Sequence, residues 1–324
     1  MTEKLPEFKA LQMTLFEITL PEKTDEEKER ALKEVISSME QFYSGMMSVD
    51  DSSHGGYFAI ELAVENKSSD FTFNVAVHDS KKSLFEKQML AIFHNAKIVE
   101  KKNDYNVFNE KGFTVASKAT LTKDSIWPLK TYDLFDHDPL NSILNSFSKI
   151  DTVGEGAAIQ IIIKPQGDQH TKRYKKTLDD IMKGEKISEA ISKNAEGVLK
   201  YVEGFFRGIG NLAMSKEEKE KAETKKKEAS QNVDQISVDQ IKNKMLSPTV
   251  AIYLRIVASA SDEISANQIL SDIESSFNQF ENTHGNKIVF NRVKKNDLKG
   301  LFYDFTFRLF DEGSRILTNR KILF

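Results

Sequence analysis

A repeated pattern of apolar and polar positions marks two stretches of this chain of 324 residues. The first stretch, FNVAVHDSKKSLFEKQML, covers residues 73–90, and the second, YLRIVASASDEISANQIL, covers residues 253–270. In each, apolar residues alternate with polar ones and then recur three and four positions apart, which predicts a strand followed by a helix. The repetition indicates an internal duplication.

The positions that both stretches share have two interpretations. They are Gln88, Met89 and Leu90 in the first stretch and Gln268, Ile269 and Leu270 in the second. Apolar residues at strand and helix spacing are usually core residues, and we interpret the shared positions in this way. The functional alternative is a pair of matched ligand grooves, one in each copy.

The first copy of the duplication is predicted over residues 1–110. Its elements, in order, are a strand at 15–21, a helix from the capping box of Thr24 and Glu27 to Tyr43, strands at 57–65 and 71–79, a helix at about 83–94 and a strand at 96–102. The two middle strands form a hairpin. This order is that of a ferredoxin-like βαββαβ unit.

A connector is predicted over residues 111–156, and it contains the only tryptophan, Trp127. Asp138 and Pro139 are a favourable helix start, and the apolar residues that follow, up to Ile150, form the face of a short helix. We expect this segment to pack against both copies.

The second copy is predicted over residues 157–324. Its elements are a strand at 157–165, a helix at 171–184, an insertion at about 186–245, a strand at 249–261, a helix at 262–280 and strands at 287–293 and 301–310. The predicted fold class is therefore α+β, with tandem ferredoxin-like units, antiparallel sheets and a long helical insertion in the second unit.

The insertion contains a glycine-rich apolar stretch, EGVLKYVEGFFRGIGNLAM, at residues 196–214. A glycine inside a helix costs about 1 kcal/mol relative to alanine, so a helix here needs a surface to lie on. That surface is the protein's own core, a partner protein or a lipid interface. The candidate partner-binding residues are Phe205, Phe206, Ile209 and Leu212. The mixed-charge run that follows, at 215–235, is typical of a solvated helix or linker.

Composition narrows the classes of protein. The length suits two domains, and the values of 39% hydrophobic and 29% charged residues with a net charge of -3 indicate a polar surface with no global attraction to nucleic acid or anionic lipid. Cysteine is absent, which excludes disulfides and thiolate chemistry. We find no signal peptide and no membrane span, and we expect a cytoplasmic protein, with the inner face of the membrane as the alternative.

Known catalytic motifs are absent from the sequence. The glycine clusters at 154–156 and 208–211 lack the lysine of a phosphate-binding loop, and no dinucleotide, serine-hydrolase or zinc-protease motif occurs. The six histidines are isolated, and the only dense group of potential metal ligands is Asp136, His137 and Asp138, which we interpret as a loop or helix cap. We therefore expect no enzyme, no cofactor and no metal site.

Two short segments with arginine and aromatic residues, YLRI at 253–256 and FRLF at 307–310, raise the alternative of a sheet face that stacks bases. The RNA-binding motif of βαββαβ domains is absent. Nucleic acid is therefore not the partner we favour. A protein that binds single-stranded nucleic acid on a sheet face remains the alternative function.

Four landmarks together resemble a known family. They are LFEITLPEKTDEEKERA at 15–31, the segment from Trp127 to Pro165, GFFRGIGNLAM at 204–214 and the segment from Thr249 to Phe280. This set resembles the non-ATPase N-terminal region of bacterial FtsK/HerA-like ATPases of type IV secretion or conjugation systems. The resemblance extends from about residue 13 to about residue 310, and it rests on order and apolar texture because these segments contain no catalytic residues.

The resemblance implies a non-catalytic interaction or assembly module, which positions the motor or contacts the channel. In that family a P-loop ATPase domain follows the last strand, whereas this sequence ends at Phe324. The implied partners are a P-loop ATPase, in cis beyond the C-terminus or in trans, and a membrane channel component. A peripheral membrane contact and a homo-oligomeric ring are further implications.

Overall fold

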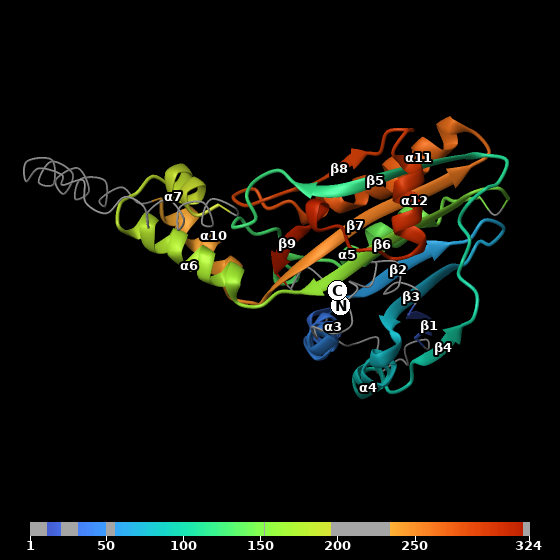
Figure 1. Ribbon diagram of the computed structural model, residues 1–324, viewed down its shortest axis with the longest axis horizontal. Coiled ribbons are helices and arrows are strands. Elements are labelled where there is room, and N and C mark those ends of the chain that lie inside the picture. Colours follow the sequence, from blue (N-terminus) through green and yellow to red (C-terminus); the bar gives the residue numbers. More distant parts are fainter. Residues whose placement is uncertain (1–11, 21–31, 50–55, 152, 196–233, 320–324) are drawn as a thin grey trace, which may run out of the picture.

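The computed structural model describes residues 12–20, 32–49, 56–151, 153–195 and 234–319 (Figure 1). Its centre is an antiparallel sheet of nine strands, in which the order is β4-β1-β3-β2-β6-β7-β5-β8, with β9 paired to β7. The strands are β1 (Met13–Thr19), β2 (Phe58–Val64), β3 (Phe71–His78), β4 (Lys97–Lys101), β5 (Phe113–Leu121), β6 (Gly156–Pro165), β7 (Thr249–Ala260), β8 (Ile288–Arg292) and β9 (Ile316–Asn319). The prediction of an α+β fold with antiparallel strands is confirmed.

The sheet has two halves with the same order of connections. The first half runs β4-β1-β3-β2, and the second runs β8-β5-β7-β6 when read from its own outer edge. Strands β2 and β6 join the halves in antiparallel register, with Glu61 opposite Gln160. We call this pairing the central junction.

The described part of the chain contains eight α-helices. They are α3 (Leu32–Met46), α4 (Lys82–Ile92), α5 (Pro139–Phe147), α6 (Gln169–Met182), α7 (Ile187–Lys193), α10 (Gln235–Met245), α11 (Glu263–Ser276) and α12 (Leu298–Thr306). None of these helices is long and apolar enough to span a membrane.

One side of the sheet, which we call the four-helix face, packs against α3, α4, α5 and α11. Their buried residues include Phe42, Phe85, Phe147 and Ile273, and they share one apolar core with alternate residues of the central strands, such as Ile60. This continuous core accounts for the apolar spacing of those helices, because each buries one face against the sheet.

The opposite side of the sheet, which we call the α12 face, packs against α12 and the segment that precedes β5. Leu301 and Phe305 of α12 and Val107 of that segment contact small residues of the sheet such as Ala63 and Ala158. Small side chains on the sheet allow the helix and the loop to lie close to it.

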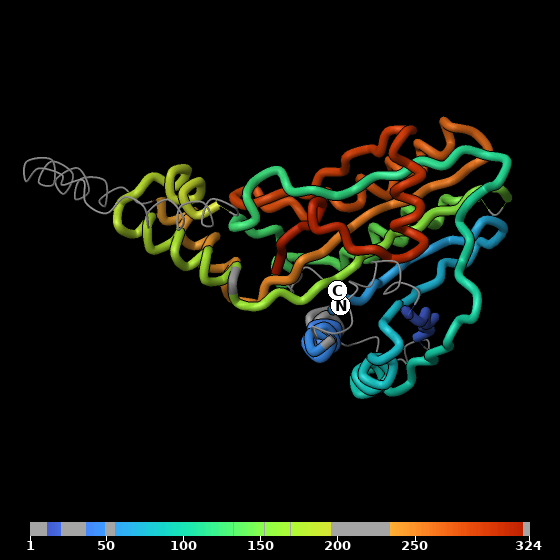
Figure 2. Tube along the Cα trace, viewed as in Figure 1, coloured from blue at the N-terminus to red at the C-terminus, as the bar shows by residue number. Residues whose placement is uncertain are grey.

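Helices α6, α7 and α10 form a projection beyond one end of the sheet, which we call the helical arm (Figure 1). Figure 2 shows its chain leaving the body after β6 and returning before β7. The arm has its own apolar core, which contains Tyr174 and Ile241 and reaches Ile126 of the body. Its attachment includes an ion pair between Arg173 and Asp124 and a hydrogen bond of 3.1 Å from Tyr174 Oη to Ser125 Oγ.

A buried lysine completes the attachment of the arm. Lys244 of α10 is 1% exposed, and its Nζ donates a hydrogen bond of 2.9 Å to the backbone carbonyl oxygen of Leu317 in β9. Burial lowers the pKa of Lys244 to about 7, although nearby Asp124 opposes this shift. The arm is therefore held against the C-terminal strand through a side chain whose charge is costly to bury.

Two sequence predictions about secondary structure are wrong. Residues 113–121, which the prediction assigns to the connector, form β5 inside the sheet. Residues 301–310 are predicted as a strand, but 301–306 belong to helix α12. Strand β5 has small or polar residues such as Ser117 at its buried positions, so it lacks an apolar run. In the second segment, Leu301 and Phe305 are buried four positions apart, which is helical spacing.

The repeated stretches form β3 with α4 and β7 with α11, so the predicted strand and helix are confirmed in both stretches. Their shared positions are only partly core. Met89, Ile269 and Leu270 are buried, whereas Leu90 is 44% exposed. The difference arises on the helices, because α11 packs against α5 and extensively against two strands, β7 and β5, whereas α4 packs chiefly against α3.

Candidate functional site

Four polar residues cross the centre of the sheet on its α12 face. Asn74, Glu61, Gln160 and Arg255 lie on β3, β2, β6 and β7, and the strand register places each opposite the next. All four are at most 2% exposed, and each has an apolar residue on either side of it in its strand. We call them the polar row. Buried polar groups at this density require hydrogen-bond partners, because each unpaired one costs free energy.

The carboxamide of Gln160 links an anion to a cation within the row. Its Nε2 donates hydrogen bonds to Glu61 Oε1 at 2.6 Å and to the backbone carbonyl oxygen of Phe305 at 3.1 Å. Its Oε1 accepts a hydrogen bond of 2.6 Å from Arg255 Nε. These partners fix the orientation of the amide, since only one end of it can donate.

Arg308 connects Glu61 to a second carboxylate. Its Nε and Nη2 donate to the two oxygens of Glu61 at 2.8 and 3.0 Å, and its Nη1 and Nη2 donate to Asp104 at 2.9 Å each. Both contacts are bidentate, which is the strongest geometry for an arginine and a carboxylate. This pairing joins the first half of the sheet to the segment after α12.

The backbone of Arg308 has a conformation that normally favours glycine. Its φ angle is 53°, and it follows the last turn of α12. Leu309 N donates to Asp304 O at 2.9 Å and Arg308 N donates to Phe305 O at 3.2 Å, which is the Schellman pattern of a helix C-terminus. An arginine at this position is explained by the two carboxylates that its side chain reaches.

Arg255 is bound chiefly by backbone groups at the end of α12. Its Nη2 donates to Asp304 O at 2.7 Å and its Nη1 donates to Leu309 O at 3.2 Å. Carbonyl oxygens at a helix C-terminus carry partial negative charge, so they stabilise a guanidinium. The Tyr253 ring lies 4.6 Å from the same group, in a cation–π contact.

The electrostatic effects of burial differ between the two arginines. Burial lowers the pKa of Arg255. Burial also acts to lower the pKa of Arg308, but Glu61 and Asp104 outweigh it and raise that pKa well above its ordinary value. Burial raises the pKa of Tyr105, beside this cluster, well above its ordinary value. The geometry of the polar row is that of a fixed structural network that holds α12 on the sheet.

The structure accounts for the two arginines that suggested base stacking. Arg255 of YLRI is 0% exposed and Arg308 of FRLF is 8% exposed, and both guanidinium groups are bound within the protein. These two arginines therefore do not lie on an exposed sheet face. Arg255 lies between apolar residues of β7 and opposite Gln160, which is a sequence signal of the buried network.

The predicted partner-binding residues Phe205, Phe206, Ile209 and Leu212 lie outside the described residues. The acidic group around His137 behaves as a helix cap, because Asp138 Oδ1 accepts a hydrogen bond of 2.9 Å from Leu140 N at the start of α5. Within the described part of the chain, no group of three or more potential ligands is placed to hold a metal ion.

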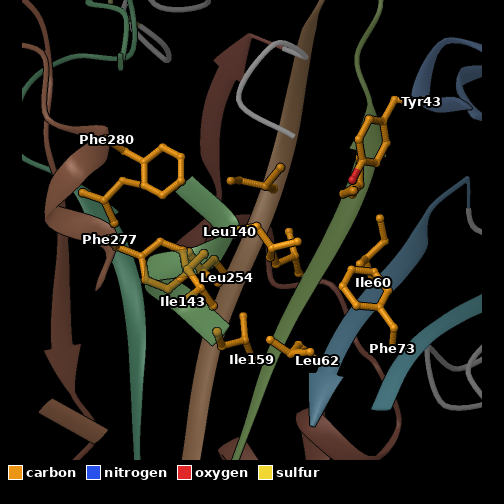
Figure 3. Close-up of a pocket in the computed structure, with 14 residues that line it drawn as sticks. Tyr43, Ile60, Leu62, Phe73, Leu140, Ile143, Ile159, Leu254, Phe277 and Phe280 are labelled. Atoms are coloured by element: carbon orange, nitrogen blue, oxygen red, sulfur yellow. The ribbon is translucent and has the colours of Figure 1, made fainter. Parts of the chain in front are cut away.

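An apolar cavity of about 80 Å³ lies on the four-helix face above the central junction (Figure 3). Its fourteen lining residues are isoleucine, leucine, phenylalanine and one tyrosine, Tyr43. Ile60 and Ile159 of the joined strands form part of its floor. Figure 3 shows Phe277 and Phe280 on one side of this space and Tyr43 and Phe73 on the other.

The fold and its interior together define an α+β domain with one continuous antiparallel sheet and a buried polar row at its centre. The chain belongs to a family described as a domain of unknown function, DUF8128, which matches residues 12–319. No curated protein matches the chain.

Proposed function

We propose that the chain consists of two ferredoxin-like units, with the second beginning at β5. Each half of the sheet has the connectivity strand, helix, strand, strand, helix, strand, and each has the strand order expected for that fold. In the second half, α5 and α11 correspond to α3 and α4. The helical arm then lies between the second and third strands of the second unit.

We further propose that this domain is a non-catalytic interaction module of a type IV secretion or DNA-transfer ATPase system. One observation carries the proposal: an interstrand connection has been replaced by a helical arm that projects from the sheet and is anchored to the body (Figure 1). A projecting element of fixed orientation suits a contact with another protein, since little ordering cost remains on binding.

In the sequence, the candidate partner-binding residues lie between two helices of the arm. Helix α7 ends at Lys193 and α10 begins at Gln235, so Phe205 and Phe206 connect to the body only through the arm. Aromatic side chains commonly provide the largest contributions at protein interfaces.

The resemblance described above supplies the class of partner. We propose a P-loop ATPase, in cis or in trans, or a component of the membrane channel, met at the cytoplasmic face of the membrane. The domain would hold the motor in position and would not itself hydrolyse nucleotide. A ring of several copies is compatible with the same role.

Affinity capture from the native host, with the tagged full chain as bait, tests this role. We expect capture of a P-loop ATPase or of a channel component by the native chain. The double substitution Phe205→Asp and Phe206→Asp should abolish that capture. The matched control is Phe113→Asp, which changes a residue that is 48% exposed on β5 and should leave capture intact.

Each outcome of the capture experiment has a defined meaning. If the double variant unfolds, as judged by circular dichroism and thermal melting, the two phenylalanines belong to the core and the proposed contact is wrong. Capture of single-stranded nucleic acid alone would replace the proposal with the alternative function. Equal capture by the native chain and the folded double variant would place the contact elsewhere.

A further inference from the structure

The cavity on the four-helix face has a geometric origin in the joining of the two halves. Helices α3 and α4 cover the first half of the sheet, and α5 and α11 cover the second. The central junction lies between these two pairs of helices, and the cavity lies above it. The residues that line the space, such as Leu62, Leu254 and Phe280, are large, so the space is not caused by small side chains (Figure 3). It therefore results from the way the helices are arranged over the sheet.

The walls of the cavity are buried and almost wholly apolar. Ile159, Leu254 and Tyr43 are at most 3% exposed. Protein interiors rarely contain voids larger than a water molecule, and an apolar cavity is poorly suited to hold water. A space of about 80 Å³ is thus suited to an apolar ligand.

The opening of the cavity is marked by its least buried lining residues. Phe73, Leu140 and Ile161 are half-buried, whereas most of the other lining residues are buried. They belong to β3, α5 and β6, and they are the lining residues that come nearest to the surface. A ligand longer than the cavity can extend outward between these residues.

We propose that this cavity binds the end of an unbranched aliphatic chain, such as the acyl chain of a fatty acid or a lipid. An engineered apolar cavity of roughly 150 Å³ accommodates benzene, and the smaller volume here favours a linear chain over a ring. The aliphatic and aromatic walls provide burial for methylene groups, and the open end accommodates the rest of the molecule. This inference is independent of the assembly role.

Titration of the full chain with straight-chain alkanols and with decanoic acid, followed by calorimetry and thermal melting, tests the inference. We expect saturable binding that strengthens with chain length, because each buried methylene group contributes. The variant Ile159→Phe fills the space and should weaken binding about tenfold, which corresponds to the loss of roughly two buried methylene groups. Vesicles of phosphatidylglycerol distinguish a lipid acyl chain from a free fatty acid as the source.

Two further variants keep the test decisive. Leu140→Trp changes a half-buried residue at the opening, so it should fold and should also weaken binding. Ile162→Leu, on the same strand as Ile159 but on the other face, should leave binding unchanged. The proposal is overturned if no aliphatic probe binds, or if Ile159→Phe, Leu140→Trp and Ile162→Leu bind equally well.

Discussion

The two faces of the central junction differ in how their interiors are filled. On the α12 face, Glu61 and Gln160 lie opposite one another in a network in which each partner has a defined direction. On the four-helix face, the neighbouring residues Ile60 and Ile159 line a cavity. Because successive residues of a strand point to opposite faces, the same two strands carry both environments.

This difference indicates a division of roles at the place where the halves meet. Directional hydrogen bonds fix α12 and the segment around Arg308 relative to both halves of the sheet. Apolar contacts have no direction, so the opposite face can leave space without losing register. The polar row specifies the alignment of the two halves. Substitutions in it should therefore cost more unfolding free energy than substitutions beside the cavity.

The largest effect is expected from Arg308→Met. This change leaves Glu61 buried without its cation, and breaking a buried ion pair in this way costs about 3–5 kcal/mol of unfolding free energy. Urea denaturation of the full chain measures the loss. The double variant Glu61→Leu with Arg308→Met should recover most of it, because both buried charges are then removed. If the double variant is no more stable than Arg308→Met, the ion pair is not the source of the effect.

The elements around this junction illustrate what the sequence could predict. Strands β2 and β7 and helix α11 have strong apolar periodicity and were predicted within a few residues of their observed bounds. Strand β5 could not be found in this way, since Ala116, Ser117 and Ala119 occupy its buried positions. Its place in the sheet depends on pairing with β7 and β8, which is a tertiary property.

The candidate sites were less predictable than the elements. A single polar residue within an apolar strand, as at Glu61, Gln160 and Arg255, was a readable signal of a buried network. Arg308 and Asp104, which complete this network, are 204 positions apart in the chain, and no local pattern connects them. The cavity depends on the distance between two pairs of helices, which the periodicity of each helix does not specify.

A smaller effect is expected from Gln160→Leu, which removes the amide between Glu61 and Arg255. Hydrogen bonds to charged groups contribute about 1.5–3 kcal/mol each, and we expect a loss of about 2–3 kcal/mol because both ions keep other partners. Asn74→Leu is the matched control, since Asn74 Nδ2 donates its hydrogen bond to the neutral Thr72 hydroxyl at 2.9 Å. An equal loss in both variants would show that the amide is not a special link.

Lys244 is a buried cation that is bound by a backbone carbonyl oxygen, whereas Arg308 is bound by two carboxylates. The pKa of Lys244 is lowered from 10.5 to about 7 in the folded protein, so the unfolded chain binds more protons between these values. Its contribution to stability should therefore rise with pH across this window, by up to about 1.4 kcal/mol per pH unit. Lys244→Met should remove this dependence in urea denaturation series, whereas Lys242→Met, in the same helix, should retain it.

The smallest effect compares matched substitutions on the two faces of one strand. Ile159→Val borders the cavity and Ile162→Val lies on the α12 face, and the native side chains are 3% and 0% exposed. Such changes typically cost about 0.5–1.5 kcal/mol, and the cost grows with the number of neighbours that the lost methyl group contacts. We expect Ile159→Val to lie near the lower bound and Ile162→Val near the upper one, as measured by urea denaturation. The reverse order would mean that the space beside Ile159 is closed in solution, and the contrast between the two faces would then rest on the polar row alone.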